Sequence, residues 1–303
     1  MLNPKQCCII YDSRTIYTIS KEHSVMKNIY KEVTIVNILV TVDSNYILPL
    51  KVMLKSLFLN NAEDEFTIYL IYSRIKEDEL ADLNTYIKQH GRQLKAIKIA
   101  DDYFEDAPTL MHYTKEMYYR LLAFKFLPEE LDKILYLDPD ILVINKIDGL
   151  YHLDLEDYLF AAAYHNKISV REINRFRLSP YEIDKYYNSG VLLMNLKLQR
   201  NLMNENEIFD FVRKHKSKLI MPDQDILNAL YSKKIKSIDE ILYNYDARFY
   251  NYYKILSSGE YDMDYVIYHT VILHFCGKKK PWQKKYSGKF HSLYKHYEKL
   301  ALS

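Results

Sequence analysis

Two aspartates and one histidine carry the chemistry that the sequence indicates most directly. Asp138 and Asp140 follow the apolar residues 133–137, and His274 follows a second apolar run at residues 265–273. Two carboxylates this close repel each other, and a divalent cation between them relieves the conflict. Oxygen ligands suit Mg²⁺ or Mn²⁺, and an added imidazole shifts the preference toward Mn²⁺. We therefore predict a metal site of Asp138, Asp140 and His274 that holds Mn²⁺, with Mg²⁺ as the second candidate ion.

Each of these residues also has an ordinary structural explanation. An Asp-x-Asp pair often caps a helix or lies in a turn, and a histidine beside apolar residues is more often a core side chain than a ligand. The pair with the following Ile141 and Leu142 also resembles the aspartyl-phosphate nucleophile of haloacid-dehalogenase-type phosphohydrolases. That motif normally closes the first strand of its domain, whereas several strand–helix units precede Asp138. A phosphohydrolase therefore stays as an alternative function.

A short basic run after His274 indicates which chemistry such a metal would serve. Gly277 allows backbone amides to approach a ligand closely, and Lys280 adds a positive charge. Glycosyl transfer from a sugar nucleotide leaves negative charge on the phosphate oxygens of the departing diphosphate, which a metal and a lysine stabilise. The alternative for the lysines is a solvated basic turn.

The elements that would position these residues alternate between strands and helices. Apolar runs predict strands at residues 34–42, 66–72, 94–99 and 133–137. Helical spacing predicts helices at residues 44–59, 76–90 and 114–126, with Ser44 capping the first and Gly91 ending the second. This alternation implies an α/β fold with a mostly parallel sheet and helices on both faces. Ligands collect beyond the carboxyl ends of such strands, where Asp43 and the Asp138–Asp140 pair fall.

The second half of the chain is less regular. Strands are predicted at residues 160–164 and 190–194, and helices at residues 205–215 and 223–231. The polar stretch at 165–187 between the two strands is either a lid or a surface excursion. With no repeat or low-complexity linker after residue 32, we expect residues 33–282 to form one domain, preceded by an N-terminal appendage at residues 1–32.

Composition excludes several classes of protein. Forty-two Lys and Arg against 40 Asp and Glu leave a formal net charge of +2, which gives no reason to expect a nucleic-acid partner. Hydrophobic residues make up 49% of the chain, which excludes global disorder. The three cysteines predict neither a disulfide framework nor a zinc site. Without a secretory signal or an apolar stretch of about 20 residues, we expect a cytoplasmic protein.

Six short motifs occur in a fixed order. They are residues 41–46 (TVDSNY), 119–121 (YRL), 135–140 (LYLDPD), 187–192 (YNSGVL), 223–228 (DQDILN) and 274–282 (HFCGKKKPW). In this order the chain resembles the family 8 retaining glycosyltransferases, which include bacterial lipopolysaccharide galactosyl- and glucosyltransferases and glycogenin. The resemblance extends over residues 33–282. It implies a GT-A-type nucleotide-sugar fold, with a Rossmann-like sheet and a smaller second sheet, and a UDP-glucose or UDP-galactose donor.

The resemblance also implies a role for each motif residue. The nucleotide would contact the residues of the first and last motifs, namely Thr41, Asp43, Asn45 and Tyr46 at the uracil and ribose and Gly277 and Lys280 at the phosphates. The donor sugar would be surrounded by Arg120, Asn188, Ser189, Asp223 and Gln224. His165 stands where lipopolysaccharide-type members often carry an aspartate, so the choice between glucose and galactose stays open.

Asp223, Gln224 and Asp225 are the candidate catalytic residues. Retaining glycosidases use a carboxylate nucleophile about 5 Å from its acid partner. The matching position here is Gln224, whose amide oxygen is a poor nucleophile. We therefore favour attack by the acceptor on the face that the diphosphate leaves, with Gln224 stabilising positive charge on the sugar. Asp225 as a covalent nucleophile is the second mechanism, and an inactive nucleotide-sugar-binding protein is the non-enzymatic alternative.

The C-terminal segment, residues 283–303, follows a basic run and is itself basic and aromatic. Trp282, Tyr286, Phe290, Tyr294 and Tyr297 recur at helical spacing among eight lysines at 278–299. We favour a terminal helix that packs its aromatic face on the domain. The alternative is peripheral contact with the inner face of a membrane, near a lipid-linked acceptor. The acceptor itself, whether saccharide, lipid-linked glycan or protein, is not indicated.

Overall fold

The structure is a computed structural model, and it describes residues 35–100, 103, 117–164, 177–178, 181 and 183–303 together with three short N-terminal strands. The chain divides into two compact units, Met1–Ile35 and Val36–Ser303. In the first unit, β1 (Ile9–Asp12), β2 (Thr15–Thr18) and β3 (Asn28–Ile29) form an antiparallel sheet. The assignment of residues 1–32 as an appendage to the larger domain stays a prediction.

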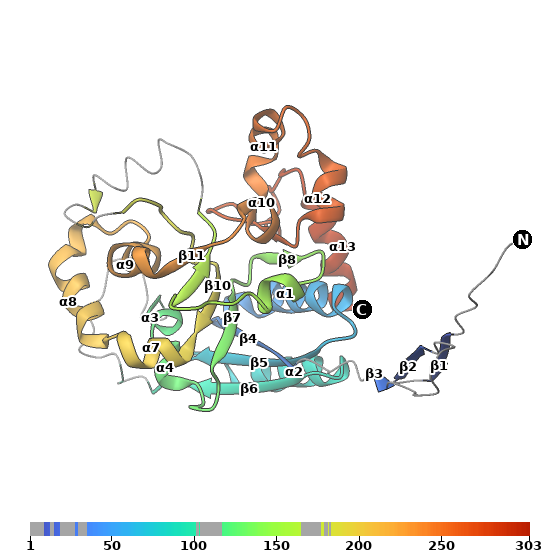
Figure 1. The fold of residues 1–303 in the computed structure, drawn as a ribbon, viewed down its shortest axis with the longest axis horizontal. Helices are drawn as coiled ribbons and strands as arrows, with labels where there is room; N and C mark the ends of the chain where they lie inside the picture. The colour runs from blue at the N-terminus through green and yellow to red at the C-terminus, as the bar shows by residue number, and fades with distance from the viewer. Residues whose placement is uncertain are drawn as a thin grey trace, which may run out of the picture. The chain divides into compact units, whose positions relative to one another are not determined.

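A seven-stranded sheet forms the centre of the second unit (Figure 1). Its strands, in spatial order, are β11 (Ile235–Ser237), β9 (Phe160–Ala162), β10 (Val191–Asn195), β7 (Lys133–Leu137), β4 (Ile35–Thr41), β5 (Glu65–Tyr72) and β6 (Gln93–Lys98). The pairs β4–β7, β5–β6 and β9–β11 are parallel, and β10 is antiparallel to both of its neighbours. The predicted mostly parallel α/β sheet is confirmed.

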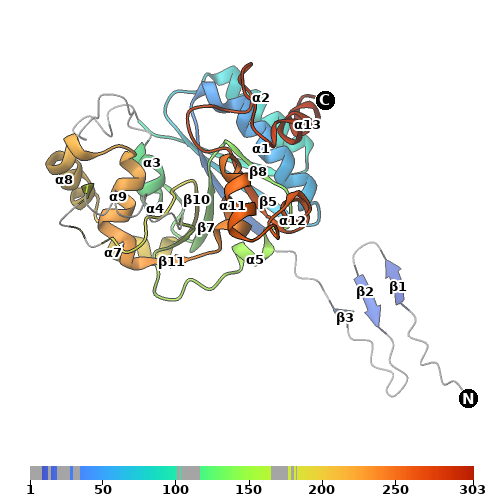
Figure 2. The ribbon, with the colours of Figure 1, turned by 90° about the horizontal axis from the view of Figure 1, so that it is seen from above.

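Both faces of this sheet are covered, because its central strands are apolar at successive positions. On one face Ile38 and Val40 pack with α1 (Ile47–Asn60) and α2 (Glu77–Gln89). On the other face Leu39 packs with a second set of helices, namely α3 (Met117–Leu121), α4 (Ala123–Phe126), α7 (Leu196–Leu202), α8 (Glu205–His215) and α9 (Pro222–Tyr231). Figure 2 shows the two sets of helices from above.

A smaller sheet lies beside the first one. It consists of β12 (Tyr245–Asp246), β13 (Ile272–His274) and β8 (Ile141–Val143), where β13 runs parallel to β12 and antiparallel to β8. The short helices α5 (Asp148–Tyr151), α10 (Glu240–Tyr243), α11 (Tyr250–Leu256) and α12 (Met263–His269) occupy the connections around it. Because β8 starts directly after Asp140 and β13 ends at His274, this sheet positions two of the three predicted metal ligands.

The C-terminal helix α13 (His291–Leu302) lies alongside α1 (Figure 1). Phe290 and Tyr294 are buried in one cluster with Val52 of α1, and Trp282 and Tyr297 pack against that cluster. The aromatic face of the segment is therefore packed on the domain, which is the arrangement that we favoured. No helix in the described part of the chain is long and apolar enough to cross a membrane.

Three local expectations have a definite outcome. Gly91 ends α2 with φ +69°, as predicted for a left-handed C-terminal residue. The prediction that Ser44 caps the first helix is wrong: Asp43 accepts from the N–H of Asn45 and caps a 3₁₀ turn at Ser44–Tyr46, and α1 starts only at Ile47. The helix expected at 114–126 is broken at Leu122 into α3 and α4, and its first residues lie outside the described part.

Candidate active site

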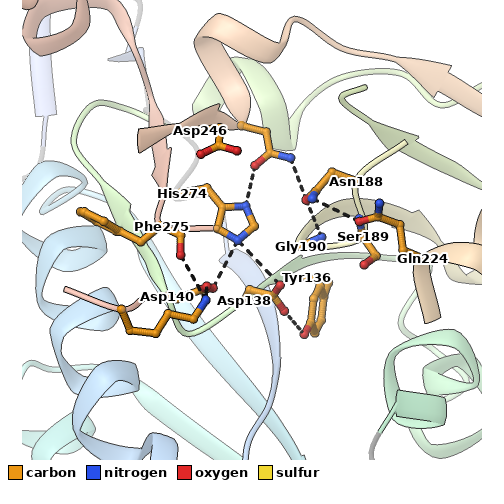
Figure 3. Close-up of polar contacts among 12 residues, drawn as sticks. Tyr136, Asp138, Asp140, Asn188, Ser189, Gly190, Gln224, Asp246, His274 and Phe275 are labelled. Carbon is orange, nitrogen blue, oxygen red and sulfur yellow. Dashed lines mark hydrogen bonds and ion pairs between the residues drawn. The ribbon is translucent and has the colours of Figure 1, made fainter. Parts of the chain in front are cut away.

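The predicted metal ligands meet where the two sheets adjoin (Figure 3). Asp138 follows β7, and its N–H donates to the carbonyl of Gly190 at 2.8 Å. The carbonyl of Asp140 accepts from the N–H of Phe275 at 2.9 Å, directly after His274. These two backbone bonds join the Asp-x-Asp segment to the residue before β10 and to the residue after β13. The three side chains therefore converge although His274 lies far along the chain from the aspartates.

One ligand atom from each of Asp138, Asp140 and His274 lies within 4.8 Å of the others. Nε2 of His274 is 3.3 Å from Oδ1 of Asp140 and 3.9 Å from Oδ2 of Asp138. Residues 139–140 form a turn, so this turn and not the alternation of an extended strand brings the two carboxylates together.

The protonation pattern of His274 fits a metal ligand. Its Nδ1 donates to Oδ1 of Asn244 at 2.7 Å, so Nε2 is the nitrogen that faces the two carboxylates. Burial acts to lower the pKa of His274, but Asp140 and Cys276 raise it, so without a cation Nε2 carries a proton, and a bound metal would take the place of that proton. An imidazole nitrogen beside two carboxylates is a donor set suited to a divalent transition metal such as Mn²⁺. These residues fit a cation.

Two side-chain cations already balance the carboxylates. Lys280 pairs with Asp140, and Nη1 of Arg120 lies 2.9 Å from Oδ1 of Asp138. Burial acts to raise the pKa of Asp140, but His274 and Lys280 hold that pKa well below its usual range. The repulsion between the two carboxylates is therefore met at Asp140 by these two groups and not by protonation of its carboxylate. Asp140 stays ionised and ready to bind a cation.

The predicted nucleotide-binding residues lie next to this cluster. Oγ1 of Thr41 is 3.3 Å from the hydroxyl of Tyr136, and that hydroxyl donates to Asp138. Tyr46 packs edge-on against Trp282, with 5.8 Å between the ring centroids. Burial raises the pKa of Tyr46, and the charges of Lys280, Asp140 and Asp43 act on it as well. Gly277, with φ +90°, adopts a left-handed conformation that favours glycine.

The predicted sugar-binding residues form a second connected group. Arg120 lies 3.3 Å from Oδ2 of Asp223 and donates to the carbonyl of Ser189. Oγ of Ser189 donates to Asp223 at 2.8 Å, and Nδ2 of Asn188 donates to Oε1 of Gln224 at 3.2 Å. Because Arg120 contacts both Asp138 and Asp223, this group adjoins the metal cluster. His165 lies outside the described residues.

Asp225 does not face this group. It is fully buried, and Arg177 binds both of its oxygens, Oδ2 at 2.8 Å and Oδ1 at 2.5 Å. The hydroxyl of Tyr186 and the backbone N–H groups of Ile220 and Met221 also donate to it. With both oxygens occupied, this carboxylate has the surroundings of a structural ion pair, which speaks against the covalent-nucleophile mechanism.

Comparison with known proteins identifies the family. The family model described as glycosyl transferase family 8 matches residues 37–286. The chain belongs to glycosyl transferase family 8. The haloacid-dehalogenase alternative is thereby set aside.

Relatives of this family 8 glycosyltransferase include two named bacterial proteins. General stress protein A of Bacillus subtilis is 27% identical over 87% of this chain and 93% of its own length. The lipopolysaccharide 1,2-glucosyltransferase of Escherichia coli is 27% identical over 82% of this chain and 73% of its own. The crystal structure of the galactosyltransferase LgtC with donor and acceptor sugar analogs has the same fold, with a TM-score of 0.73, 24% identity, and coverage of 87% of this chain and 95% of that one.

Three residues of the site were not among our predicted site residues. Tyr136 lies inside a predicted strand, but no sequence signal marked its hydroxyl as a partner of Asp138. Gly190 comes so close that an added Cβ would lie 2.4 Å from Cε1 of His274. Its place in the Asn-Ser-Gly motif was the available signal. Asn244, the partner of His274, lies in an unremarkable Tyr-Asn-Tyr sequence and had none.

Proposed function

We propose that this family 8 glycosyltransferase transfers a hexose, glucose or galactose, from a UDP-sugar to a glycan, lipid-linked or protein acceptor, with Mn²⁺ held by Asp138, Asp140 and His274. The observation that carries the proposal is the convergence of those three ligand atoms, with Nε2 of His274 turned toward the two carboxylates. Lys280 and Gly277 lie beside this cluster as phosphate-binding groups. Thr41, Asp43, Asn45 and Tyr46 are the proposed contacts of the nucleoside.

The bound cation would supply charge stabilisation to the departing diphosphate. Lys280, now paired with Asp140, is placed to exchange that partner for a phosphate oxygen when the cation takes up the carboxylate charge. Arg120 holds Asp138 and Asp223 together, and its always-charged guanidinium keeps both carboxylates oriented. Asp223 is thereby held as an acceptor for a sugar hydroxyl.

For retention we propose attack by the acceptor on the face that the diphosphate leaves. Oε1 of Gln224 accepts from Asn188 and from the N–H of Ser189, so the amide is held in one orientation beside the sugar site. A neutral, fixed amide dipole can stabilise positive charge on the sugar without forming a covalent bond. The neighbouring Asp225 is occupied by Arg177, which supports this mechanism over a glycosyl–enzyme intermediate.

For the donor and the acceptor we propose chemical classes. One relative is a glucosyltransferase, and a protein with the same fold is a galactosyltransferase, so both UDP-sugars are candidates. We propose the cytoplasm as the working compartment, because the three cysteines show no disulfide pattern. Contact with a membrane would use the exposed lysines of 283–303, since the aromatic face of α13 is packed on the domain.

A donor screen tests the proposal. The full chain is incubated with UDP-glucose, UDP-galactose and simple phosphomonoesters, each with Mn²⁺, Mg²⁺ or EDTA, and sugar release is measured alongside saturation-transfer NMR. We expect hydrolysis of one UDP-sugar that needs the metal and is abolished by EDTA. UDP-sugar binding without turnover under any metal would favour an inactive binding protein, and phosphate release from the monoesters alone would overturn the assignment.

A further inference from the structure

A buried asparagine connects the two halves of the site. Asn244 is only 1% exposed, accepts from His274 through Oδ1 at 2.7 Å, and donates through Nδ2 to Oδ1 of Asn188 at 2.9 Å (Figure 3). Asn188 donates in turn to Oε1 of Gln224. The side chains thus form one unbroken hydrogen-bonded relay from the proposed metal ligand to the proposed sugar-stabilising amide.

Two backbone N–H groups determine the direction of this relay. The N–H of Gly190 donates to Asn188 at 2.9 Å, which requires the Asn188 oxygen at that position. The N–H of Ser189 donates to Gln224 at 3.3 Å and sets its amide in the same way. Because Asn188 presents its oxygen, Asn244 must face it with nitrogen and turn its own oxygen to His274. Nδ1 of His274 is then a hydrogen-bond donor, and Nε2 is the nitrogen left for a metal.

The fold brings the three parts of the relay together from distant segments. Asn244 directly precedes β12, whose Asp246 is the register partner of His274 on β13. Asn188 and Gly190 lie in the segment just before β10, and Gln224 lies in the first turn of α9. The asparagine therefore stands at the junction between the small sheet and the large one.

We infer that Asn244 is a positioning residue that couples the metal site to the sugar site. With its oxygen it binds Nδ1 and thereby aims Nε2 of His274 at Asp138 and Asp140. With its nitrogen it holds Asn188 and, through it, Gln224. This inference rests on the proposed metal-dependent function. Partners of this kind typically affect metal affinity about 10- to 100-fold when they are removed.

Two substitutions separate the two ends of the side chain. Asn244→Leu removes both hydrogen bonds at similar volume, so we expect Mn²⁺ to bind about 10- to 100-fold more weakly and kcat to fall. Asn244→Asp keeps an oxygen for Nδ1 of His274 but turns a second oxygen toward Oδ1 of Asn188. We expect this variant to bind Mn²⁺ within about threefold of the wild type, whereas its kcat at saturating Mn²⁺ falls by at least about tenfold.

Asn61→Leu is the matched control. Asn61 is 2% exposed and also bonded at both ends, accepting from the N–H of Ile147 at 2.9 Å and donating to the carbonyl of Leu57 at 3.0 Å, but it takes no part in the relay. Mn²⁺ affinity is measured without nucleotide, by electron paramagnetic resonance of the free ion, and each variant is checked by thermal unfolding. We expect Asn61→Leu to lose stability without losing Mn²⁺ affinity relative to the wild type.

The outcomes distinguish this inference from the function on which it rests. A wild-type protein that binds no Mn²⁺ would overturn the proposed metal site and the relay together. A wild type that binds Mn²⁺ while Asn244→Leu binds it equally well would overturn the relay alone. If Asn244→Asp and Asn244→Leu lower Mn²⁺ affinity and kcat to the same extent, Asn244 is a general structural residue and the proposed separation of its two ends is wrong.

Discussion

Two acidic clusters among the described residues, Asp225 with its partners and the Asp138–Asp140 pair, differ in the donors that face their carboxylates. Asp225 accepts from two guanidinium nitrogens, a tyrosine hydroxyl and two backbone N–H groups, all directed at one carboxylate. Asp138 and Asp140 instead place two carboxylates beside one imidazole and two long cationic side chains. The donors around Asp225 occupy both of its oxygens and include fixed backbone groups. The carboxylates of Asp138 and Asp140 are met instead by one imidazole and by long, flexible side chains.

The difference separates a structural carboxylate from one that can bind a cation. Backbone N–H groups cannot leave Asp225, so a new ligand there would have to break buried hydrogen bonds at a cost of several kcal/mol. At Asp140 the partners are the flexible Lys280 and an imidazole whose Nε2 is itself a proposed ligand. Burial and negative charge are common to both clusters, and the mobility of the partners distinguishes them.

The largest expected effect comes from removing one carboxylate of the Asp138–Asp140 pair. Asp140→Asn removes one anionic ligand while keeping the side-chain size, so Mn²⁺ affinity should fall at least about 100-fold and turnover about 1000-fold. The measurements are Mn²⁺ titration and UDP-sugar hydrolysis. Asp210→Asn, at an exposed residue that pairs with Arg213, is the control and should match the wild type. A fully active Asp140→Asn protein would refute the metal site.

Asp225→Asn should show the opposite profile. The substitution leaves the guanidinium of Arg177, whose side chain is 13% exposed, facing a neutral amide, and we expect a loss of about 3 kcal/mol in the free energy of unfolding. Mn²⁺ affinity should stay within about twofold of the wild type, because Asp225 is not among the ligands. Chemical denaturation and Mn²⁺ titration measure the two quantities. A glycosyl adduct on Asp225 in mass spectra would contradict its structural assignment.

Gly190→Ala should give the smallest effect, and it tests whether Gly190 is in contact with the metal cluster. The added Cβ would lie 2.4 Å from Cε1 of His274 and 2.6 Å from Oδ2 of Asp138, so the ligands must shift. We expect Mn²⁺ affinity to fall about tenfold and stability by about 1–3 kcal/mol. Gly149→Ala, whose Cβ would meet only the hydroxyl of Tyr243 at 3.1 Å, should lose stability alone. Equal Mn²⁺ affinity in both variants would place Gly190 outside the cluster.

Much of the scaffold could be predicted from local patterns. The apolar strand before Asp138 and the helix ending at Gly91 appear as expected, because burial and capping depend on neighbouring residues. Ser44 was assigned the capping position that Asp43 takes, since two adjacent capping residue types cannot be distinguished without the backbone angles. The break at Leu122 had no local signal, because no glycine or proline marks it.

The sequence by itself determined the donor types of the site: two carboxylates after an apolar strand, a distant histidine, and a basic run behind it. The chemistry of a side chain depends only on its type, so these candidates could be named in advance. Only the tertiary structure decided that a turn brings Asp138 and Asp140 together, that Asn244 joins His274 to Asn188, and that Arg177 occupies Asp225. The contacts of Asn244 and Arg177 join segments far apart in the chain, so they form only when the chain has folded.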